Sequence, residues 1–253
     1  MSLRPTSDKK FHQIYWQTWA DLVFVHWSVD PDALASLLPP ELEPDLYEGK
    51  AYVGLVPFRM TGIRPVFLPA LPGLSRTLET NVRTYVKHRN RQGDPAPSVW
   101  FFSLEAENTL AVILARLGYG LPYFKASMWL KKSIQENGHL AYAAGSHRHW
   151  PKPAPVSSLV QAEFANESLE AAKPDTLEHF LVERYALYAK RRGQLLQAFV
   201  NHEPYRIAPG RLLACEPWLI TAAGLPTPSA QETAIVHRAA DVRVRIGRAS
   251  VVR

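Results

Sequence analysis

The chain has 253 residues with a formal net charge of +6, and 47% of its residues are hydrophobic. This composition supports a large buried core and excludes global disorder. The basic residues are scattered and come without a zinc-finger, helix-turn-helix or single-strand-binding pattern, so we expect no nucleic-acid partner.

The cysteine content and the hydropathy pattern indicate a cellular location. Cys215 is the single cysteine, which excludes an intramolecular disulfide and favours a reducing compartment. The first residues, MSLRPTSDKK, lack the apolar core of a signal peptide. No window approaches the length of a membrane-spanning apolar run. We therefore predict a cytoplasmic protein with no membrane partner.

The N-terminal part of the chain divides into a polar segment and the start of the folded region. Residues 1–10 are polar and charged, and we expect them to be disordered. Residues 11–253 are expected to form one domain. Asp30 is a favourable N-cap and Pro31 suits the first helical position, so a helix is predicted over 31–38.

Most of the remaining chain is predicted to form short strands. The 21 prolines, set against 13 glycines, favour short elements joined by rigid turns over a helical bundle. The strand at 98–106 is apolar on both faces, as in a central strand. The predicted strands span residues 21–28, 51–60, 79–86, 98–106, 121–134, 139–148, 157–165, 185–190, 194–202, 205–215 and 235–246.

Two further helices and several turns complete this prediction. Leucine and isoleucine residues at helical spacing predict a helix over 107–117, with Gly118 as its C-cap. Thr176 is expected to cap a helix over 177–183. Turns and stiff loops are expected at 63–76, at Gly93, Pro95 and Pro97, at Asn137-Gly138, at Pro151, Pro153 and Pro155, and at Arg192-Gly193.

Ionisable residues gather on two of the predicted strands. Strand alternation places Glu79, Arg83 and Tyr85 on one face of the first, and Tyr123 and Lys125 on one face of the second. These polar faces either look at water, as in many antiparallel sheets, or line the interior of a barrel. In an interior, buried acids and bases must pair, and their pKa values shift.

Other residues of types that can bind metals or take part in catalysis have simpler interpretations. His147 and His149 share a strand face at a spacing that can chelate a metal, but no third ligand is evident and an Arg148-rich surface is favoured, so we expect no metal site. His26 and His237 are interpreted as core histidines. Cys215 is interpreted as a small buried hydrophobic residue.

Several common catalytic signatures are missing from the chain. It contains no GxSxG, HExxH, P-loop or GxGxxG sequence. These absences remove the common hydrolase, metalloprotease, nucleotide-binding and dinucleotide-binding interpretations, and we expect no cofactor.

A set of short segments, taken together, resembles a known family. The segments are DLVFVHW, LLPPELEPDLYEGKAYVGLVPF, ETNVRTYV, VWFFSLEA, LPYFKASM, ERYALY and DVRV. Over about residues 15–246 they resemble the YqjF-like family of uncharacterised bacterial proteins, which is similar in fold to acetoacetate decarboxylase. The resemblance implies a predominantly β fold: a single-domain, closed antiparallel β-barrel with a few peripheral helices and a central cavity.

The resemblance also suggests which residues face that cavity. Decarboxylases of this kind carry a strand Glu, then an Arg, and then Pro-Lys-Lys with an Ala two residues on. On this chain the Glu corresponds to Glu79, the Arg to Arg116, the Pro to Pro122 and the Ala to Ala126. Through the resemblance, Arg116 therefore joins the candidate ligand-binding residues.

The same comparison places the two catalytic lysines on other residue types. The lysine that forms the Schiff base falls on Tyr123, the second lysine falls on Phe124, and Leu117 replaces the Glu that follows the Arg. Lys125 shares the face of Tyr123, and we expect it to form an ion pair with Glu79. The inherited decarboxylation mechanism is therefore not expected.

Two functions of different class remain. The first is a non-catalytic module that binds a small, partly apolar organic ligand bearing a carbonyl or carboxylate. The second is a lyase-like enzyme acting on a small keto acid or enolisable carbonyl compound. Whether there is catalysis stays open. The oligomeric state also stays open, and a homodimer is one alternative.

Candidate catalytic residues are Lys125, Tyr123 and Glu79, and the candidate ligand-binding residues are Glu79, Arg83, Arg116, Tyr123, Lys125 and Tyr85. We expect Glu79, Arg83 and Arg116 to form one connected polar cluster.

Overall fold

The fold is given by a computed structural model that describes residues 13–67, 69–70, 75–90, 96–228 and 233–252. The disorder expected over residues 1–10 lies outside these ranges. Part of the loop expected at 63–76 and the turn residues Gly93 and Pro95 lie outside them too.

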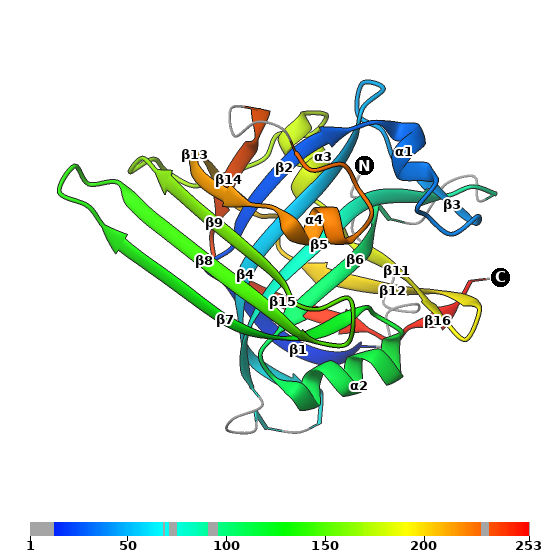
Figure 1. Ribbon diagram of the computed structural model, residues 1–253. Coiled ribbons are helices and arrows are strands. Elements are labelled where there is room, and N and C mark those ends of the chain that lie inside the picture. The colour runs from blue at the N-terminus through cyan, green and yellow to red at the C-terminus, as the bar shows by residue number, and fades with distance from the viewer. Residues whose placement is uncertain (1–12, 68, 71–74, 91–95, 229–232, 253) are drawn as a thin grey trace.

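The described chain is mostly β, and its strands form one sheet (Figure 1). The strands are β1 (Gln13–Ala20), β2 (Val23–Val29), β3 (Leu42–Pro44), β4 (Ala51–Pro65), β5 (Arg76–His88), β6 (Ser98–Ala106), β7 (Tyr123–Ile134), β8 (Leu140–Trp150), β9 (Val156–Phe164), β10 (Glu170–Ala171), β11 (Ala186–Arg191), β12 (Gln194–His202), β13 (Arg206–Glu216), β14 (Ile235–Ala239), β15 (Val242–Gly247) and β16 (Ser250–Val251). The predicted fold class is confirmed at this level, while closure of the sheet into a barrel stays a prediction.

The expectation of a fully antiparallel sheet is wrong at β6. This strand pairs in parallel with β7 and with β11, and it is antiparallel only to β5. Parallel neighbours need a crossover, and the helix α2 (Thr109–Tyr119) supplies it between β6 and β7.

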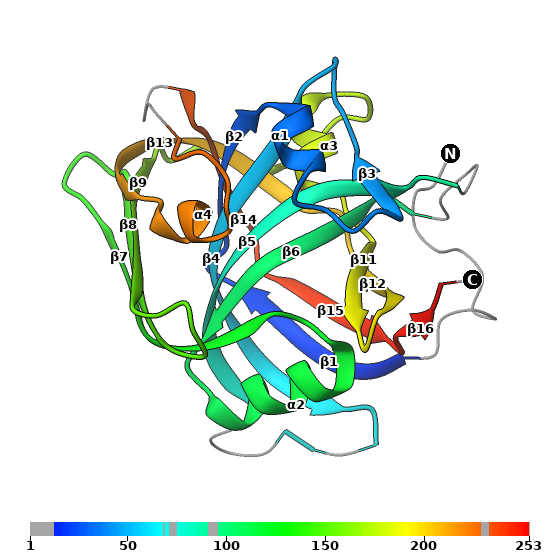
Figure 2. The same ribbon diagram turned by 45° about the vertical axis from the view of Figure 1, so that its right-hand side comes forward.

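Strands β4, β5 and β6 run through the middle of the molecule. Figure 2 shows β7, β8, β9 and β13 to one side of them and β1, β11, β12 and β15 to the other. The sheet order is β1-β15-β12-β11-β6-β7-β8-β9-β13-β14-β2-β4-β5-β3, with further pairings between β1 and β4 and between β6 and β5.

Both faces of the central strands are buried, which explains the long apolar runs in the sequence. One hydrophobic cluster contains Phe24, Phe58, Tyr85 and Leu104. The other contains Val82 and many further valine, alanine and leucine side chains. Because alternate residues of β5 enter different clusters, this strand separates two packed interiors. We call the interior that contains Tyr85 the Tyr85 side and the interior that contains Val82 the Val82 side.

The short helices begin largely where the sequence indicates. Asp30 caps α1 (Pro31–Ala35), and its side chain accepts from the backbone N–H of Asp32 and Ala33. Thr176 caps α3 (Leu177–Val182) in the same way. The helix α4 (Trp218–Ala222) is not predicted, because its cap, Pro217, makes no side-chain hydrogen bond.

Helix α2 ends two residues later than expected. Its left-handed C-cap is Gly120, at φ 69°, and not Gly118. A Cβ on Gly120 would lie 2.7 Å from the carbonyl oxygen of Lys190, so glycine is required there for both conformation and space. None of the described helices is both long enough and apolar enough to cross a membrane.

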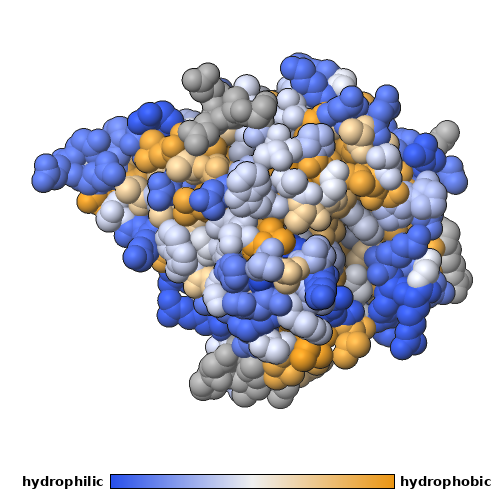
Figure 3. All heavy atoms as spheres, in the orientation of Figure 1, coloured by the Kyte–Doolittle hydropathy of each residue, from blue (hydrophilic) through white to orange (hydrophobic). Residues whose placement is uncertain are grey.

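The apolar stripe of α2 faces outward. Val112 is the buried residue of this helix, while Leu110, Ile113, Leu114 and Leu117 are exposed. Figure 3 shows hydrophobic side chains at the surface in the region of α2. The helical spacing therefore predicts the helix correctly, but it does not mark a core-facing side.

Candidate functional site

A row of polar side chains follows β5 on its Tyr85 side. Glu79, Asn81, Arg83 and Tyr85 alternate along the strand and are all buried. Of the two interpretations of this strand face, the structure excludes the solvent-facing one. The row continues the apolar wall formed by neighbouring residues of β4 such as Phe58, which pairs with Glu79.

Glu79 is a buried carboxyl held by neutral partners. It is 3% exposed and accepts a hydrogen bond of 2.7 Å from the Tyr123 hydroxyl and one of 3.3 Å from the Asn81 amide. Burial raises the pKa of Glu79 to about 7, against the lowering effect of these hydrogen bonds. The carboxyl can therefore hold or release a proton near neutral pH.

The register of three strands explains this arrangement. Glu79 lies opposite Ala106 of β6, which lies opposite Lys125 of β7. One step along, Asn81 lies opposite Leu104, which lies opposite Tyr123. Residues paired in this way share a face, so Tyr123 reaches across β6 to the carboxyl. Burial and Glu79 together raise the pKa of Tyr123 well above its ordinary value.

Lys125 lies in the same row as Glu79, but the ion pair expected between them is wrong. The half-buried amine donates to the carbonyl oxygen of Glu107 at 2.6 Å and to that of Ala126 at 3.3 Å. Tyr123 and Asn81 already occupy the carboxylate, while the carbonyl of Glu107, just after β6, and that of Ala126 on β7 accept from the amine.

The expected cluster of Glu79, Arg83 and Arg116 is also corrected. Arg116 donates from Nη1 to the carbonyl oxygen of Tyr123 at 2.7 Å and lies over the Phe124 ring. It therefore holds the start of β7 through the backbone. Among the described residues, the ion pairs include neither Glu79 nor Arg83.

Arg83 joins a second group of buried side chains further along β5. Its Nη2 donates to the carbonyl oxygen of Leu181 at 3.0 Å and lies 3.5 Å from the Tyr85 hydroxyl. The same hydroxyl is 2.6 Å from Nε2 of His26. Burial, and after it Arg83, lowers the pKa of His26 well below its ordinary value, so this imidazole is neutral.

The sequence interpretation of His26 as a satisfied core histidine is correct only in part. The ring is fully buried, but its Nδ1 has no hydrogen-bond partner. Four other polar atoms on β5 and β14 share this condition, namely Oδ1 of Asn81, Nε of Arg83, Nδ1 of His237 and Nε of Arg238. Alternation along β2 could have predicted which face of the strand His26 occupies, but it could not have predicted that His26 contacts Tyr85.

A buried ion pair on the Val82 side was not predicted. Arg148 of β8 donates from Nε to Oε1 of Glu105 at 2.9 Å, and its guanidinium lies 3.7 Å from the centre of the Phe124 ring. Burial raises the pKa of Glu105 to about 6, and Arg148 opposes that rise. The Arg148-rich surface favoured by the sequence is therefore wrong, since Arg148 points into the core.

The remaining candidates lie apart from this row. His147 and His149 are exposed and bond to Ser157 and Ser127, and no group of three metal-ligating side chains occurs in the described ranges. Cys215 is half-buried, and burial raises the pKa of its thiol to about 12.

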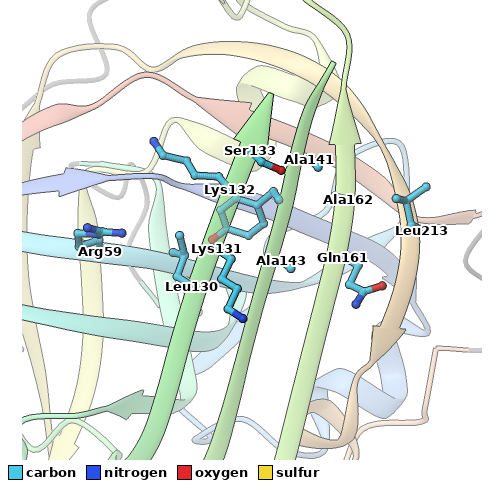
Figure 4. Close-up of a pocket in the computed structure, with 11 residues that line it drawn as sticks. Arg59, Leu130, Lys131, Lys132, Ser133, Ala141, Ala143, Gln161, Ala162 and Leu213 are labelled. Carbon is cyan, nitrogen blue, oxygen red and sulfur yellow. The ribbon is translucent and has the colours of Figure 1, made fainter. Parts of the chain in front are cut away.

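Three open pockets with volumes of about 660, 560 and 300 Å³ lie away from Glu79. The largest is lined from β4, β7, β8, β9 and β13. Figure 4 shows Lys131 and Lys132 of β7 extending in different directions there, with Arg59 across from them. Its cationic side is partly neutralised, because Asp21 forms ion pairs with both Arg59 and Lys132.

The overall arrangement of strands is that of acetoacetate decarboxylase-like proteins. An acetoacetate decarboxylase-like enzyme from Sphingomonas wittichii RW1 superposes with a TM-score of 0.59 at 14% identity, covering 95% of this chain and 93% of that one. The enduracididine biosynthesis enzyme MppR, complexed with the condensation product of pyruvate and imidazole 4-carboxaldehyde, gives 0.58 at 12% identity, covering 97% and 92%. At these identities the likeness concerns the fold alone.

Sequence comparison is more specific. Residues 16–243 match DUF2071, described as an uncharacterized conserved protein family. The chain is 37% identical over 192 residues to the uncharacterized protein YqjF of Bacillus subtilis strain 168, covering 75% of this chain and 73% of YqjF. The protein therefore belongs to the DUF2071 family, and the expected YqjF-like relationship is confirmed.

Proposed function

We propose that this protein binds a small, partly apolar organic ligand that carries a carbonyl or a carboxylate, and that Glu79 and Tyr123 hold its polar end. The observation that carries this proposal is the Glu79 carboxyl, buried without a cationic partner and bonded to a phenol. A buried acid that is not neutralised by a base is unfavourable in a purely structural role and is typical of a functional site.

The surroundings of this pair support a ligand of that type. The partially apolar wall would suit a short carbon chain, while Oδ1 of Asn81 is a buried acceptor without a partner. Arg116 and Lys125 contribute from the β7 side, where Arg116 donates to the carbonyl oxygen of Tyr123 and Lys125 donates to those of Glu107 and Ala126. We include Tyr85 and Arg83 in the ligand-binding set as the far end of the same row.

The fold neighbours support the chemical class. MppR is described in complexes with pyruvate and with a condensation product of pyruvate. For the present chain we propose a closed barrel formed by residues 11–253 as one domain, with the polar row facing its lumen. The pairings of β1 with β4 and of β5 with β6 support that closure. The single cysteine supports a cytoplasmic location.

A lyase-like enzyme acting on a keto acid or an enolisable carbonyl compound is the second candidate. It is favoured by the pKa of Glu79, which burial places at about 7, where a carboxyl is effective as a general acid or base. In that case Glu79 moves the proton of the substrate, and Tyr123 donates a hydrogen bond to its carbonyl oxygen. Lys125, occupied by two backbone carbonyls, is not placed as the nucleophile.

The two functions can be separated with one set of variants. Calorimetric titration with acetone, pyruvate, acetoacetate and longer oxo acids should show binding that Glu79→Gln and Tyr123→Phe weaken. Tyr142→Phe is the matched control, because Tyr142 is a buried phenol on the Val82 side, bonded to the carbonyl oxygen of Pro57. Unchanged affinity in both site variants, or equal loss in the control, contradicts the proposal.

Catalysis is tested by incubating the protein with the same ligands in deuterated buffer. Exchange of their α-protons, followed by NMR and abolished in Glu79→Gln, identifies the enzyme. Binding without exchange identifies the non-catalytic module.

A further inference from the structure

Arg83 is a buried cation without a counter-ion. Its side chain is 7% exposed, and among the described residues the ion pairs do not include it. The two other arginines that are buried in the described part of the chain each have a carboxylate partner: Arg148 has Glu105, and Arg184 has Asp45 at 2.6 Å. A guanidinium removed from water is stabilised by an anion, and here the chain supplies none.

The contacts of Arg83 leave its Nε free. Its Nη2 serves the carbonyl oxygen of Leu181, and its guanidinium lies 5.1 Å from the centre of the Phe24 ring. Its Nε has no partner. An aromatic face and a carbonyl hold the guanidinium in place while the N–H of Nε remains available.

The side chains of His26 and Arg83 both lie close to Gly54. The two residues lie in one row across β2, β4 and β5, with Gly54 between them. A Cβ on Gly54 would be 2.8 Å from Cδ2 of His26 and 3.6 Å from Cγ of Arg83, so glycine allows both side chains to approach.

The free nitrogen of His26 provides a second donor. The Tyr85 hydroxyl has a single proton and two acceptors within reach, the Leu181 carbonyl oxygen at 2.8 Å and Nε2 of His26 at 2.6 Å. Because Arg83 also donates to that carbonyl, we assign the proton to Nε2 of His26. In that tautomer Nδ1 carries the other proton, and it is buried without a partner. Two unpartnered donors, Nε of Arg83 and Nδ1 of His26, then belong to adjacent residues of one row.

We propose that Arg83 and His26 form a carboxylate-binding subsite, and that the ligand is an oxo acid whose carboxylate is separated from its carbonyl by several carbons. This inference rests on the proposed function, which places the carbonyl at Glu79 and Tyr123. Carboxylates accept from two donors at once, as an Arg–His pair of this kind requires.

The spacing of the two groups sets the length of the ligand. Glu79 and Arg83 are four residues apart on β5, which corresponds to about 13 Å between their Cα atoms. The Arg83 guanidinium is directed towards Tyr85 and Leu181, away from Glu79. A 2-oxo or 3-oxo acid is too short to contact both groups, whereas a six- or seven-carbon chain can do so.

The test compares ligands that differ only in the proposed groups. 6-Oxoheptanoate contains both the carboxylate and the carbonyl, 2-heptanone lacks the carboxylate, and acetoacetate has the two groups close together. We expect 6-oxoheptanoate to bind the native protein most tightly. Arg83→Gln should weaken 6-oxoheptanoate by roughly ten- to a hundredfold and leave 2-heptanone unchanged, as expected for a charge-assisted hydrogen bond.

Two further variants keep the result interpretable. Arg59→Gln removes a cation from β4 at a partly exposed ion pair with Asp21, and it should alter neither affinity. Arg83→Lys retains the charge but lacks Nε, and it covers the case in which Arg83→Gln does not fold. It should give a smaller loss of 6-oxoheptanoate than Arg83→Gln.

The outcomes distinguish this subsite from the function on which it rests. If Tyr123→Phe weakens 6-oxoheptanoate while neither Arg83 variant does, the Arg83 subsite is wrong and the Glu79 site stands. The subsite is equally wrong if acetoacetate binds as tightly as 6-oxoheptanoate, or if Arg83→Gln weakens 2-heptanone to the same extent. If the native protein binds none of the three compounds, the proposed function itself fails.

Discussion

Glu79 and Glu105 are buried carboxyls on neighbouring strands that are stabilised in different ways. Glu105 faces the Arg148 guanidinium, whereas Glu79 has only a phenol and an amide. Burial raises the pKa of both, to about 6 for Glu105 and to about 7 for Glu79. The rise is smaller for Glu105 because Arg148 opposes the effect of burial there, whereas Glu79 has no cationic partner.

The raised pKa of Glu79 predicts a specific pH dependence of stability. Its pKa in the folded state, about 7, lies above the ordinary value of 4.5 in the unfolded chain, so the folded state binds this proton more tightly. The free energy of unfolding therefore declines as pH rises through this window and is constant above it. Glu79→Gln should remove this term, worth about 3 kcal/mol between pH values below and above the window.

Chemical denaturation at about pH 5 and about pH 8 measures the effect. The unfolding free energy of Glu79→Gln minus that of the native protein should be larger at about pH 8 than at about pH 5. Glu136→Gln in the exposed β7–β8 turn is the control and should show no such change. A pH-independent difference for Glu79→Gln contradicts the assignment.

The two arginines with and without a carboxylate partner should differ in their contribution to stability. Arg148→Gln leaves Glu105 buried without its cation, which should lower the unfolding free energy by about 3–5 kcal/mol. Arg83→Gln removes a buried charge that has no counter-ion, so in buffer free of organic anions we expect a change of less than about 1 kcal/mol.

Urea denaturation of both variants checks this contrast. Similar losses of unfolding free energy in the two variants would show that contacts within the chain stabilise Arg83 to the same degree as Arg148.

At the scale of elements, α2 shows that helical periodicity and burial are separate properties. Val112 is 0% exposed and Leu117 is 71% exposed. Val112→Ala should lower the unfolding free energy by about 2 kcal/mol, because it removes buried methyl groups. Leu117→Ala should change it by less than about 0.5 kcal/mol. Thermal or urea unfolding of this pair provides the measurement, and a large loss in Leu117→Ala would indicate that the stripe is covered in solution.

Most strands could be predicted from the sequence, and the exceptions have local causes. The segment QIYWQTWA forms β1, but it lacks the flanking turn residues that mark a strand. The predicted strand 235–246 is two strands, β14 and β15, separated at Ala240 and Asp241. The predicted strand 51–60 continues to Pro65 because β1 pairs with its second half.

The candidate site was predictable only as a set of residues on one face. Alternation places Glu79, Arg83 and Tyr85 together, and the structure confirms that they are buried. Their partners depend on the parallel pairing of β6 with β7 and on the position of α3, which supplies the Leu181 carbonyl. Neither is encoded in the local pattern, so the ion pairs expected for Glu79 were wrong.

At the scale of the whole molecule, the central strands β4 to β6 serve two packed interiors with different contents. The Val82 side contains the internal ion pair between Arg148 and Glu105. The Tyr85 side contains the polar row, with unpartnered atoms on Asn81, Arg83 and His26, whereas Nε1 of Trp27 is such an atom on the Val82 side. Polar groups that are left without partners in a core are usually satisfied by a bound molecule or by water. The larger number of such atoms along the polar row supports the proposal that places the ligand on the Tyr85 side.

The fold shared with acetoacetate decarboxylases leads to a last prediction, that this protein does not decarboxylate acetoacetate at an enzyme-like rate. Catalysis by a Schiff base needs a free amine of lowered pKa beside the substrate. Tyr123 occupies the position that the resemblance assigns to that amine, and a phenol cannot form an iminium. The nearby amine of Lys125 donates to the carbonyl oxygens of Glu107 and Ala126.

Two measurements check this prediction on the native protein and on Lys125→Met. The first is CO₂ release from acetoacetate, which should equal the buffer rate in both. The second is borohydride reduction in the presence of acetoacetate or pyruvate, followed by mass spectrometry, which should find no adduct on Lys125. Lys125→Met should instead lower stability, because two carbonyl oxygens lose their donor. A reduced adduct on Lys125, together with CO₂ release that Lys125→Met abolishes, would show that the nucleophile has moved by two residues along β7 and that the decarboxylase chemistry has been retained.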